Sequence, residues 1–235
     1  MSIYACSDFH GHMKFYKAIK DFITPDDVVY FLGDAGDRGP EPWETIKAIA
    51  RDPQFIYLKG NHEDMLVDAI RDTIIRDSSY GWRLLAHNGG SDTFDQVMAE
   101  DDPMGWADWL HGRPTLEEYV NANREHIYLC HAGFTPWLKE DGGVKVPNRN
   151  GEKLIWDRLH YYDKDSFGPW GNAIVVHGHT PIPCLWEDLE IPQEDQEKGA
   201  LWYNAQKVCI DTGAHWTGHT VLLNLDTWEE HIFQD

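Results

Sequence analysis

The segment Asp8-Phe9-His10-Gly11-His12 follows a short apolar run, Ile3-Tyr4-Ala5-Cys6-Ser7, which predicts a buried β-strand. Asp8 and His10 are two residues apart, so in extended backbone their side chains point the same way. A carboxylate oxygen and an imidazole nitrogen held on one side of a strand end supply half of a site for a divalent metal. Taken alone, however, the segment would more often be an Asp and a His that cap the following helix.

The same pattern, an apolar run that ends in Asp, Asn or His, recurs four more times along the chain. The later runs are residues 28–32 before Gly33-Asp34, 55–58 before Gly60-Asn61-His62, 127–130 before His131, and 173–176 before His177-Gly178-His179. Sites in open α/β sheets form at the carboxyl ends of strands, and glycine there allows a tight turn beside a ligand. One such ending is an ordinary turn, but five with metal-ligating side chains predict one common site.

The segments between the early strands carry apolar residues at helical spacing. Residues 12–23, 41–51 and 62–76 predict helices, which gives two strand–helix–strand crossovers. Crossovers of this kind predict parallel pairing, with the helices packed on the sheet. The chain closes with strand candidates at 208–211, 220–226 and 230–233, whose tight connections predict antiparallel pairing.

The middle of the chain is less regular. Residues 80–124 have an irregular helical pattern, and we expect a helical insertion over the site. Three polar loops follow at 141–151, 163–171 and 193–199. Long irregular loops in a compact domain are typical of binding loops or lids, although the acidic loop at 193–199 also fits a merely solvated one.

Length and composition limit the classes of protein to consider. The chain has 235 residues, 42% of them hydrophobic, which predicts one domain over 1–235. With 20 Lys and Arg against 40 Asp and Glu, the formal charge is -20. Such a chain is repelled by nucleic acid and by anionic membranes. It also repels a phosphorylated substrate at long range, so attraction must be local, from metal ions and a few arginines.

The cysteines and the first residues bear on location. Cys6, Cys130, Cys184 and Cys209 show no regular spacing, which is typical of reduced thiols in a cytosolic protein. A disulfide between neighbouring strands is the alternative. The first strand begins at Ile3, which leaves no room for a signal peptide, and no apolar run approaches membrane-spanning length. We therefore expect a cytoplasmic protein.

Several blocks, taken in order, resemble the signature of a known family. Asp8-Phe9-His10-Gly11, Gly33-Asp34-Ala35-Gly36-Asp37-Arg38-Gly39 and Gly60-Asn61-His62-Glu63 resemble the phosphoprotein phosphatase branch of the calcineurin-like metallophosphoesterases. His131-Ala132-Gly133, Ile155-Trp156-Asp157-Arg158, Gly178-His179-Thr180-Pro181 and Ile210-Asp211-Thr212-Gly213-Ala214 look most like its small bacterial and bacteriophage lambda-type enzymes. The turn Asn88-Gly89-Gly90 is similar too, although it could be a plain turn between helices. The resemblance implies an α/β fold of two packed mixed β-sheets flanked by helices, with a helical cap insertion.

The resemblance also implies two divalent metal ions. The first would be bound by Asp8, His10 and Asp34, and the second by Asp34, Asn61, His131 and His179. Mixed nitrogen and oxygen ligands suit manganese, iron, zinc or cobalt better than calcium or magnesium, and we expect Mn²⁺. A water between two such ions loses much of its proton affinity, so as hydroxide it would be the nucleophile.

The two histidines near residue 178 have to be distinguished. His179 stands in the Gly-His-Thr triplet and is the expected ligand, whereas His177 is either an ordinary packed histidine or a partner of a ligand. Many metallophosphoesterases outside the phosphatase branch carry a further His two residues after this ligand. Here that position is Pro181, which favours the phosphatase branch.

Four further residues are implied as catalytic. His62 would be the general acid that protonates the leaving group, and Asp37 would bond its ring and raise its pKa. Arg38 and Arg158 would bind the phosphate oxygens through paired donors. The alternatives are a helix-capping role for His62 and a surface role for Arg158.

Three functions are compatible with these residues. The motifs favour a metal-dependent protein serine/threonine phosphatase, a phosphomonoesterase that acts on phosphoproteins. The alternative is a bis(5'-nucleosyl)-tetraphosphatase, which hydrolyses diadenosine polyphosphates, and a non-catalytic phosphate-binding scaffold is a third. The tryptophans Trp82, Trp106 and Trp109 could stack an adenine or simply pack. Sequence leaves open the substrate, the native metals and the oligomeric state.

Overall fold

The structure is a computed structural model, and it describes residues 1–135, 137–138, 144–146, 151–161, 173–193, 196, 199–204 and 206–234. Its helices are α1 (Met13–Phe22), α2 (Pro42–Arg51), α3 (Asn61–Ile74), α4 (Tyr80–His87), α5 (Ser91–Met98), α6 (Pro103–His111), α7 (Lys153–Trp156), α8 (Ile182–Asp188) and α9 (Ala214–Thr217). Its strands are β1 (Ile3–Cys6), β2 (Val28–Phe31), β3 (Phe55–Tyr57), β4 (Leu116–Val120), β5 (His126–Cys130), β6 (Trp137–Leu138), β7 (Val144–Lys145), β8 (Ala173–His177), β9 (Leu201–Asn204), β10 (Lys207–Cys209), β11 (His219–Asn224) and β12 (Glu230–Gln234). The expected loops at 141–151, 163–171 and 193–199 lie wholly or largely outside the described residues.

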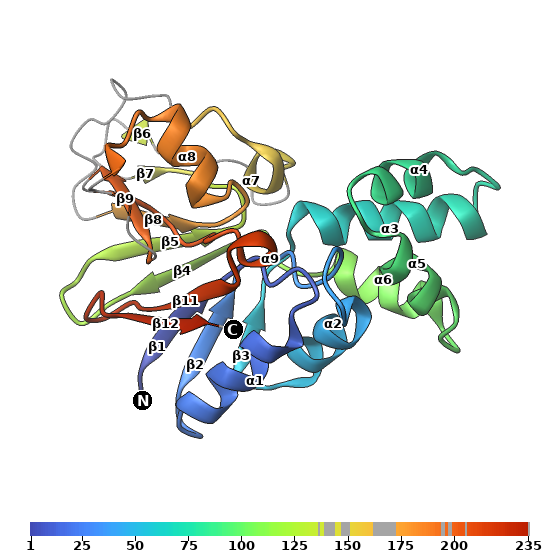
Figure 1. The fold of residues 1–235 in the computed structure, drawn as a ribbon, viewed down its shortest axis with the longest axis horizontal. Helices are drawn as coiled ribbons and strands as arrows, with labels where there is room; N and C mark the ends of the chain where they lie inside the picture. The colour runs from blue at the N-terminus through green and yellow to red at the C-terminus, as the bar shows by residue number, and fades with distance from the viewer. Residues whose placement is uncertain are drawn as a thin grey trace.

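Two mixed five-stranded sheets form the centre of the molecule (Figure 1). The first has the order β12-β11-β1-β2-β3, in which β1, β2 and β3 are parallel and β11 runs antiparallel to both neighbours. The second has the order β4-β5-β8-β10-β9, in which β5, β8 and β10 are parallel and the two edge strands are antiparallel. The expected fold class, two mixed sheets flanked by helices, is confirmed.

Alternation along the strands explains why the two sheets pack face to face. Ile3 and Ala5 of β1 belong to the core between the sheets, together with residues of β5, β8, β10 and β11. Tyr4 and Cys6, which point the other way, pack with α1, α2 and α3 on the outer face of the first sheet. On the outer face of the second sheet, Leu154 of α7 packs with residues of β4, β5 and β8, and Leu185 of α8 packs with Cys209 of β10. Both sheets are thus covered on both faces.

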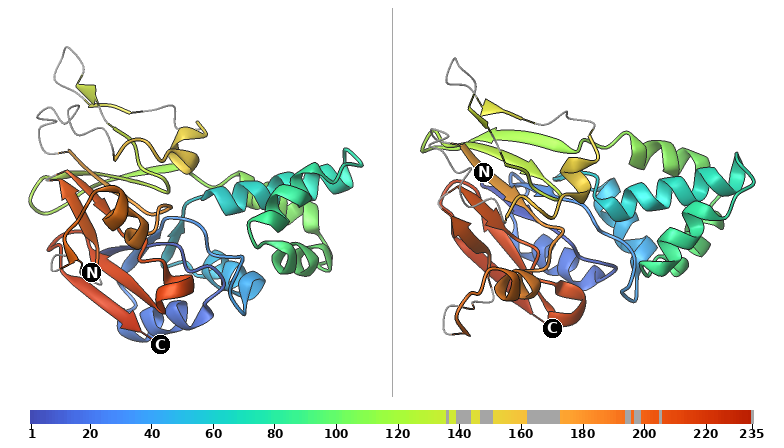
Figure 2. Two further views of the ribbon diagram at one scale, coloured as in Figure 1. Left: turned by 45° about the horizontal axis from the view of Figure 1, so that its top comes forward. Right: turned by 90° about the horizontal axis from the view of Figure 1, so that it is seen from above.

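Helices α3 to α6 form an arm that extends from the body, as Figures 1 and 2 show from three directions. Both α4 and α6 pack against α3. The expectation that residues 80–124 are helical is wrong for the last part, since the helices end at His111 and Leu116–Val120 forms β4. A turn at residues 121–125, in which the Asn121 side chain accepts two backbone N–H bonds, folds β4 back onto β5.

Residues 208–211 also differ from expectation, because they do not join the antiparallel strands that follow. Here β10 lies in the second sheet, parallel to β8 and antiparallel to β9, a strand that the sequence pattern did not reveal. The short helix α9 then carries the chain to the first sheet. Left-handed backbone at Gly213 (φ 71°) and Gly218 (φ 73°), which glycine adopts without strain, makes this short connection possible. The antiparallel pairing of β11 with β12 is as expected.

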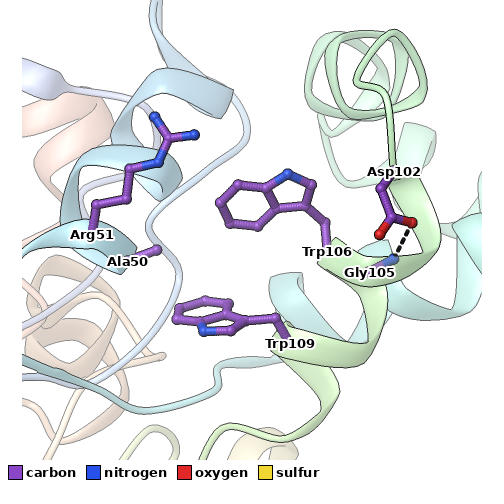
Figure 3. Close-up of a pocket in the computed structure, with 6 residues that line it drawn as sticks. All are labelled: Ala50, Arg51, Asp102, Gly105, Trp106 and Trp109. Carbon is purple, nitrogen blue, oxygen red and sulfur yellow. Dashed lines mark hydrogen bonds between the residues drawn. The ribbon is translucent and has the colours of Figure 1, made fainter.

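The tryptophans of the arm mainly pack. The Trp106 ring lies edge-on to Trp43 of α2 at 4.8 Å, and the Trp109 ring lies edge-on to Tyr57 of β3 at 5.5 Å, so the pair joins α6 to α2 and to the first sheet. Both line a cavity of about 360 Å³ between the end of α2 and the start of α6 (Figure 3). No lining residue of this cavity belongs to the predicted site, which places it apart from the catalytic groups.

The cysteines agree with the expectation of reduced thiols, although one of the four is exposed. All four cysteines, each within the described residues, are free thiols; Cys6, Cys130 and Cys209 are buried in strands, and Cys184 is exposed. Among the described helices, we find none with the length and apolar content needed to cross a bilayer.

Candidate metal and phosphate site

The carboxyl ends of the parallel strands from both sheets meet at one end of the two sheets. The first sheet contributes Asp8, His10, Asp34 and Asn61, which follow β1, β2 and β3, and the second contributes His131 and His179, which follow β5 and β8. All six side chains are buried. Residues separated by up to 171 positions therefore lie together, as in the contact of the His179 N–H with an Asp8 oxygen at 3.2 Å.

Backbone strain is concentrated in the same place. Of the ten described non-glycine residues with positive φ, six are predicted site residues: Asp8, His10, Asp34, Asp37, Arg38 and His179. Left-handed backbone is costly for residues with a Cβ and persists where the surroundings enforce it, typically at functional sites. In this chain it turns the side chains at the strand ends toward a common centre.

One group of donors is formed by Asp34, Asn61, His131 and His179. The amide oxygen of Asn61 lies 2.9 Å from His131 Nε2 and 2.8 Å from His179 Nδ1, and the two ring nitrogens are 3.2 Å apart. Asp34 Oδ1 is 3.4 Å from His131 Nε2. His131 Nδ1 donates to the Leu32 carbonyl at 2.7 Å, which leaves the Nε2 lone pair directed into the group.

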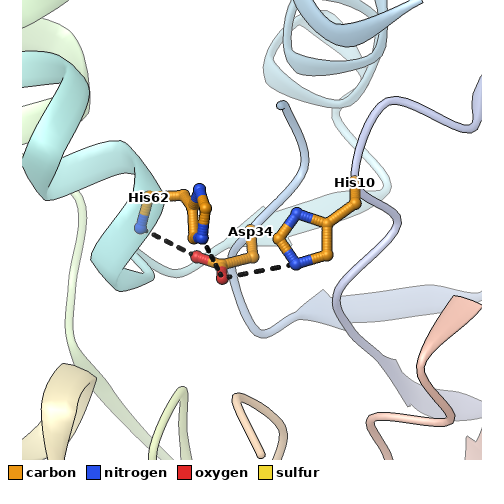
Figure 4. Close-up of side chains that lie close together, drawn as sticks. All are labelled: His10, Asp34 and His62. Carbon is orange, nitrogen blue, oxygen red and sulfur yellow. Dashed lines mark hydrogen bonds and ion pairs between the residues drawn. The ribbon is translucent and has the colours of Figure 1, made fainter. Parts of the chain in front are cut away.

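A second group surrounds the other oxygen of Asp34 and is drawn in Figure 4. His10 Nε2 lies 3.7 Å and His62 Nε2 lies 3.9 Å from Asp34 Oδ2. His10 Nδ1 donates to the Gly36 carbonyl at 3.1 Å, so its Nε2 lone pair also faces inward. The Asp8 carboxylate accepts from the Ser7 hydroxyl and from the His179 N–H. The structure thus groups His62 with two of the three expected residues, His10 and Asp34, and does not include Asp8 in the group.

The electrostatics of the cluster suit bound cations. Burial raises the pKa of Asp8 well above its usual value and that of Asp211 to about 6. The pKa of Asp34 is nevertheless held well below its usual range, because His131 and His62 outweigh the effect of burial. Burial lowers the pKa of His131, but Asp34 raises it to about 10, so the carboxylate favours a positive charge at Nε2, and a bound cation would supply that charge in place of the proton. Crowded buried carboxylates are costly without positive charge nearby, so the donor set fits divalent metal ions.

His62 and Asp37 form a buried pair beside the donor groups. His62 Nδ1 donates to Asp37 Oδ2 at 2.5 Å. Burial by itself lowers the pKa of His62, but the carboxylates of Asp34 and Asp37 outweigh it, and the pKa is raised above its usual value. The Thr93 hydroxyl of α5 accepts a hydrogen bond from the Asp37 backbone N–H and donates one to the Asp37 carboxylate. Sequence reasoning did not foresee this contact from the arm.

Glu63 is a second positioning residue that the sequence analysis left unassigned. Its buried carboxylate accepts four hydrogen bonds, from the backbone N–H groups of Asp34, Ala35 and Gly60 and from the Tyr57 hydroxyl, at 2.8–2.9 Å. The Glu63 side chain therefore fixes the turn that presents Asp34. Its place three residues after Gly60, as in a capping box, is the signal that could have revealed it.

Arg38 is an exposed residue whose guanidinium lies over the second group. Its Nη1 is 2.8 Å from His10 Nε2, and its Nη2 is 2.9 Å from His62 Nε2. The Arg38 N–H donates to the Gly89 carbonyl at 3.0 Å. The turn at residues 88–90 is therefore more than a plain connection between helices, because it holds the backbone of Arg38.

Arg158 lies on the other side of the cluster. Its Nη1 donates to Thr180 Oγ1 at 3.4 Å, and its charge contributes, after burial and His131, to the lowered pKa of His179. The two arginines therefore approach the cluster from different sheets. His177 is fully buried and packs edge-on against His160, with ring centroids 4.8 Å apart, which favours the packed alternative for this residue.

Comparison with known proteins agrees with this geometry. The model of the calcineurin-like phosphoesterase family matches residues 1–222. This chain belongs to that family. Metal binding and phosphoester hydrolysis are therefore the general chemistry of the site.

Individual relatives add finer detail about similar proteins. The symmetrical bis(5'-nucleosyl)-tetraphosphatase of Colwellia psychrerythraea is 23% identical over 97% of this chain and 90% of its own length. Two solved structures share the fold at 15% identity. One, a candidate diadenosine tetraphosphatase, has a TM-score of 0.60 and is matched over 99% of this chain and 92% of its own. The other, a protein serine/threonine phosphatase from Saccharomyces cerevisiae, has a TM-score of 0.56, with coverage of 100% and 80%.

Proposed function

We propose that this member of the calcineurin-like phosphoesterase family hydrolyses dinucleoside polyphosphates, with bis(5'-nucleosyl) tetraphosphates as its substrate class. The observation that carries the proposal is the match to the Colwellia enzyme over nearly the whole length of both chains. The protein serine/threonine phosphatase activity that the motifs favour has weaker support, since its structural relative shares the fold at 15% identity. We therefore favour dinucleoside polyphosphates, the alternative substrate class of the sequence analysis, over phosphoproteins.

The donor set would bind two ions, for which Mn²⁺ is our expectation. Asp34 lies between the two groups, with Asn61, His131 and His179 on one side and His10 on the other. When bound, such a pair of ions activates a water molecule and neutralises charge on the phosphate. We assign Asp8 to the side of His10, as the family resemblance implies, and His62 to acid catalysis, because the Asp37 carboxylate at its Nδ1 stabilises the protonated ring.

The chain's own residues would bind the substrate and move a proton. Arg38 and Arg158 present planar guanidinium groups that suit phosphate oxygens and the charge that develops during cleavage. Against the effect of burial, Asp34 and Asp37 raise the pKa of His62, so Nε2 would carry a proton for the departing oxygen once the Arg38 guanidinium, whose Nη2 lies 2.9 Å away, turns to the phosphate. In symmetrical cleavage the leaving group is a nucleoside diphosphate, which needs that proton less than an alkoxide does.

A substrate panel with Mn²⁺ tests this function. We expect kcat/KM for diadenosine tetraphosphate to exceed that for a phosphoserine peptide by roughly tenfold or more, a difference of about 1.4 kcal/mol in barrier. ADP should be the nucleotide product, measured by chromatography. A preference for the phosphopeptide would replace the proposal with protein phosphatase activity, and formation of ATP with AMP would exclude symmetrical cleavage.

Removal of either arginine should slow hydrolysis without removing metal. Arg38→Ala and Arg158→Ala should each raise the barrier by about 2–4 kcal/mol, the scale of one oriented charge-stabilising donor. Steady-state kinetics and metal analysis measure the two effects. Arg51→Ala, at an exposed position at the end of α2 and outside the site, is the matched control and should change neither. An unchanged kcat/KM for Arg158→Ala would show that this residue does not bind the phosphate.

A further inference from the structure

Asp37 and Arg38, which lie in the loop after β2, are held by the helical arm. The Arg38 N–H donates to the Gly89 carbonyl at 3.0 Å, and Arg38 Nε donates to the Asn88 carbonyl at 3.4 Å. Both Asp37 and Arg38 have left-handed backbone, with φ of 68° and 63°. Such backbone is strained for residues with a Cβ and persists where neighbouring groups enforce it. The turn between α4 and α5 is one source of that constraint.

Thr93 of α5 holds Asp37 both by its backbone and by its side chain. The Thr93 side chain is fully buried, and its hydroxyl accepts a hydrogen bond from the Asp37 N–H at 3.1 Å. The same hydroxyl donates to Asp37 Oδ1. One hydroxyl therefore joins the backbone and the carboxylate of a single residue, which leaves the Asp37 side chain little freedom to rotate.

The other oxygen of the Asp37 carboxylate is the one that meets His62. His62 Nδ1 donates to Asp37 Oδ2 at 2.5 Å, and both side chains are buried. A Cβ on Gly90, the residue that precedes α5, would lie 2.8 Å from the same oxygen, so the backbone there packs directly against it. The two carboxylate oxygens thus have different partners, Thr93 and His62. Rotation of the carboxylate would break both contacts together.

We propose that Thr93 is a positioning residue for the reaction, which holds the Asp37 carboxylate and, through it, the ring of His62. An imidazole bonded at Nδ1 to a fixed carboxylate keeps its Nε2 directed at one place. Here His62 Nε2 lies 2.9 Å from Arg38 Nη2 and 3.9 Å from Asp34 Oδ2, at the centre of the site. The action of Thr93 is indirect, since its hydroxyl bonds to Asp37. The inference rests on the acid role that the proposed function gives to His62.

Steady-state kinetics of two matched variants test this role on the Mn²⁺-loaded enzyme. Thr93→Val keeps the shape of the side chain but loses both hydrogen bonds, whereas Thr93→Ser keeps the hydroxyl. With a phosphoserine peptide, whose leaving group most needs a proton, Thr93→Val should lower kcat by roughly tenfold, the scale of one hydrogen bond to a charged group, with KM unchanged. Thr93→Ser should retain nearly full kcat. Thr45→Val, which removes the hydroxyl of another buried threonine, in α2, is the control and should change neither constant.

A double-mutant cycle shows whether Thr93 acts through His62. In the His62→Asn background, Thr93→Val should cause no further loss of kcat, because the ring that Thr93 positions is absent. A further tenfold loss in that background would overturn the inference, since the change would then damage the site in a general way. Metal content of the Thr93 variants should equal that of the wild type.

Proton NMR of the protein loaded with Zn²⁺, which is diamagnetic, tests the contact without a substrate. The wild type should show a downfield resonance of the His62 Nδ1–H, identified by its absence from His62→Asn. In Thr93→Val this resonance should move upfield or broaden, whereas Thr93→Ser should retain it. Gly90→Ala, whose added methyl would press on Asp37 Oδ2, should have the same effect and replaces Thr93→Val if that variant does not fold. A resonance that neither change alters would overturn the inference.

The outcomes separate this inference from the proposed function. If the wild type does not hydrolyse diadenosine tetraphosphate, the substrate class fails, while the Thr93 variants are compared on any phosphoester that His62→Asn slows. If His62→Asn slows all substrates equally, the acid role fails, and a resonance that depends on Thr93 still shows that Thr93 positions the ring. If Thr93→Val leaves kcat unchanged for a substrate that His62→Asn slows, the function stands and the inference is overturned.

Discussion

Asp34→Asn should abolish hydrolysis and reduce bound metal at both positions. One Asp34 oxygen lies 3.7 Å from His10 Nε2 and the other 3.4 Å from His131 Nε2, so a single carboxylate serves both donor groups. Asparagine keeps the size but loses the charge that attracts both ions. Because each ion is worth several kcal/mol of charge stabilisation, we expect kcat/KM to fall by about a thousandfold or more. Metal analysis after chelation and reconstitution measures the loss of binding.

The wild type provides the reference for that experiment. Chelated protein should lose activity and regain it with Mn²⁺ better than with Mg²⁺. Asp27→Asn is a matched control, since Asp27 is another buried carboxylate but accepts bonds from Ser2 and Thr24, near the start of β2. It should retain metal and activity even if it is less stable. Full activity in excess chelator after prolonged dialysis would remove the two-metal proposal.

His62→Asn should slow hydrolysis by an amount that depends on the leaving group. If His62 protonates the departing oxygen, a phosphoserine peptide, which loses an alkoxide, should react roughly 10²–10⁴-fold more slowly. An aryl phosphate or diadenosine tetraphosphate should be slowed much less, since their leaving groups are more acidic. Equal slowing of all substrates, with chemistry shown to limit the rate, would mean that His62 only positions the phosphate.

Metal content decides between the two positions that the geometry allows for His62. We expect it to be unchanged in His62→Asn, because Asn61 and not His62 is assigned as the ligand. The contact of His62 with Asp34 at 3.9 Å would also permit metal binding. Loss of one ion in this variant would therefore make His62 a ligand and remove the acid role.

Asp37→Asn should show the same dependence on the leaving group as His62→Asn, with a smaller loss of rate. The pH profile of kcat/KM should also shift. The Asp37 carboxylate, 2.5 Å from His62 Nδ1, contributes with Asp34 to the raised pKa of His62, against the effect of burial. Without it the pKa falls, and the acid loses its proton at lower pH. The alkaline limb of the kcat/KM profile should therefore move to lower pH. An alkaline limb that stays in place would show that another group determines it.

Much of this architecture was readable from sequence, because its causes are local. Apolar runs of strand length, each followed by a glycine turn and a metal-ligating side chain, predicted five strand ends, and Asp8, Asp34 and His131 follow strands in the structure. The left-handed backbone at Asp8 and Asp34 belongs to the same short turns. Helices α1 to α3 also follow from spacing within single segments, which is why the two early crossovers gave the correct parallel order.

What depends on contacts between distant segments was decided by the tertiary structure. Residues 208–211 entered the second sheet because β8 offered a parallel partner, and no short-range pattern distinguishes that choice from a hairpin. Thr93 reaches Asp37 across 56 positions, and His12 meets His215 only because α9 returns the chain to the first sheet. Hydrophobic period and turn chemistry act over a few residues and therefore specify the strand ends. The partners that orient those ends are chosen by the packing of the two sheets and the arm.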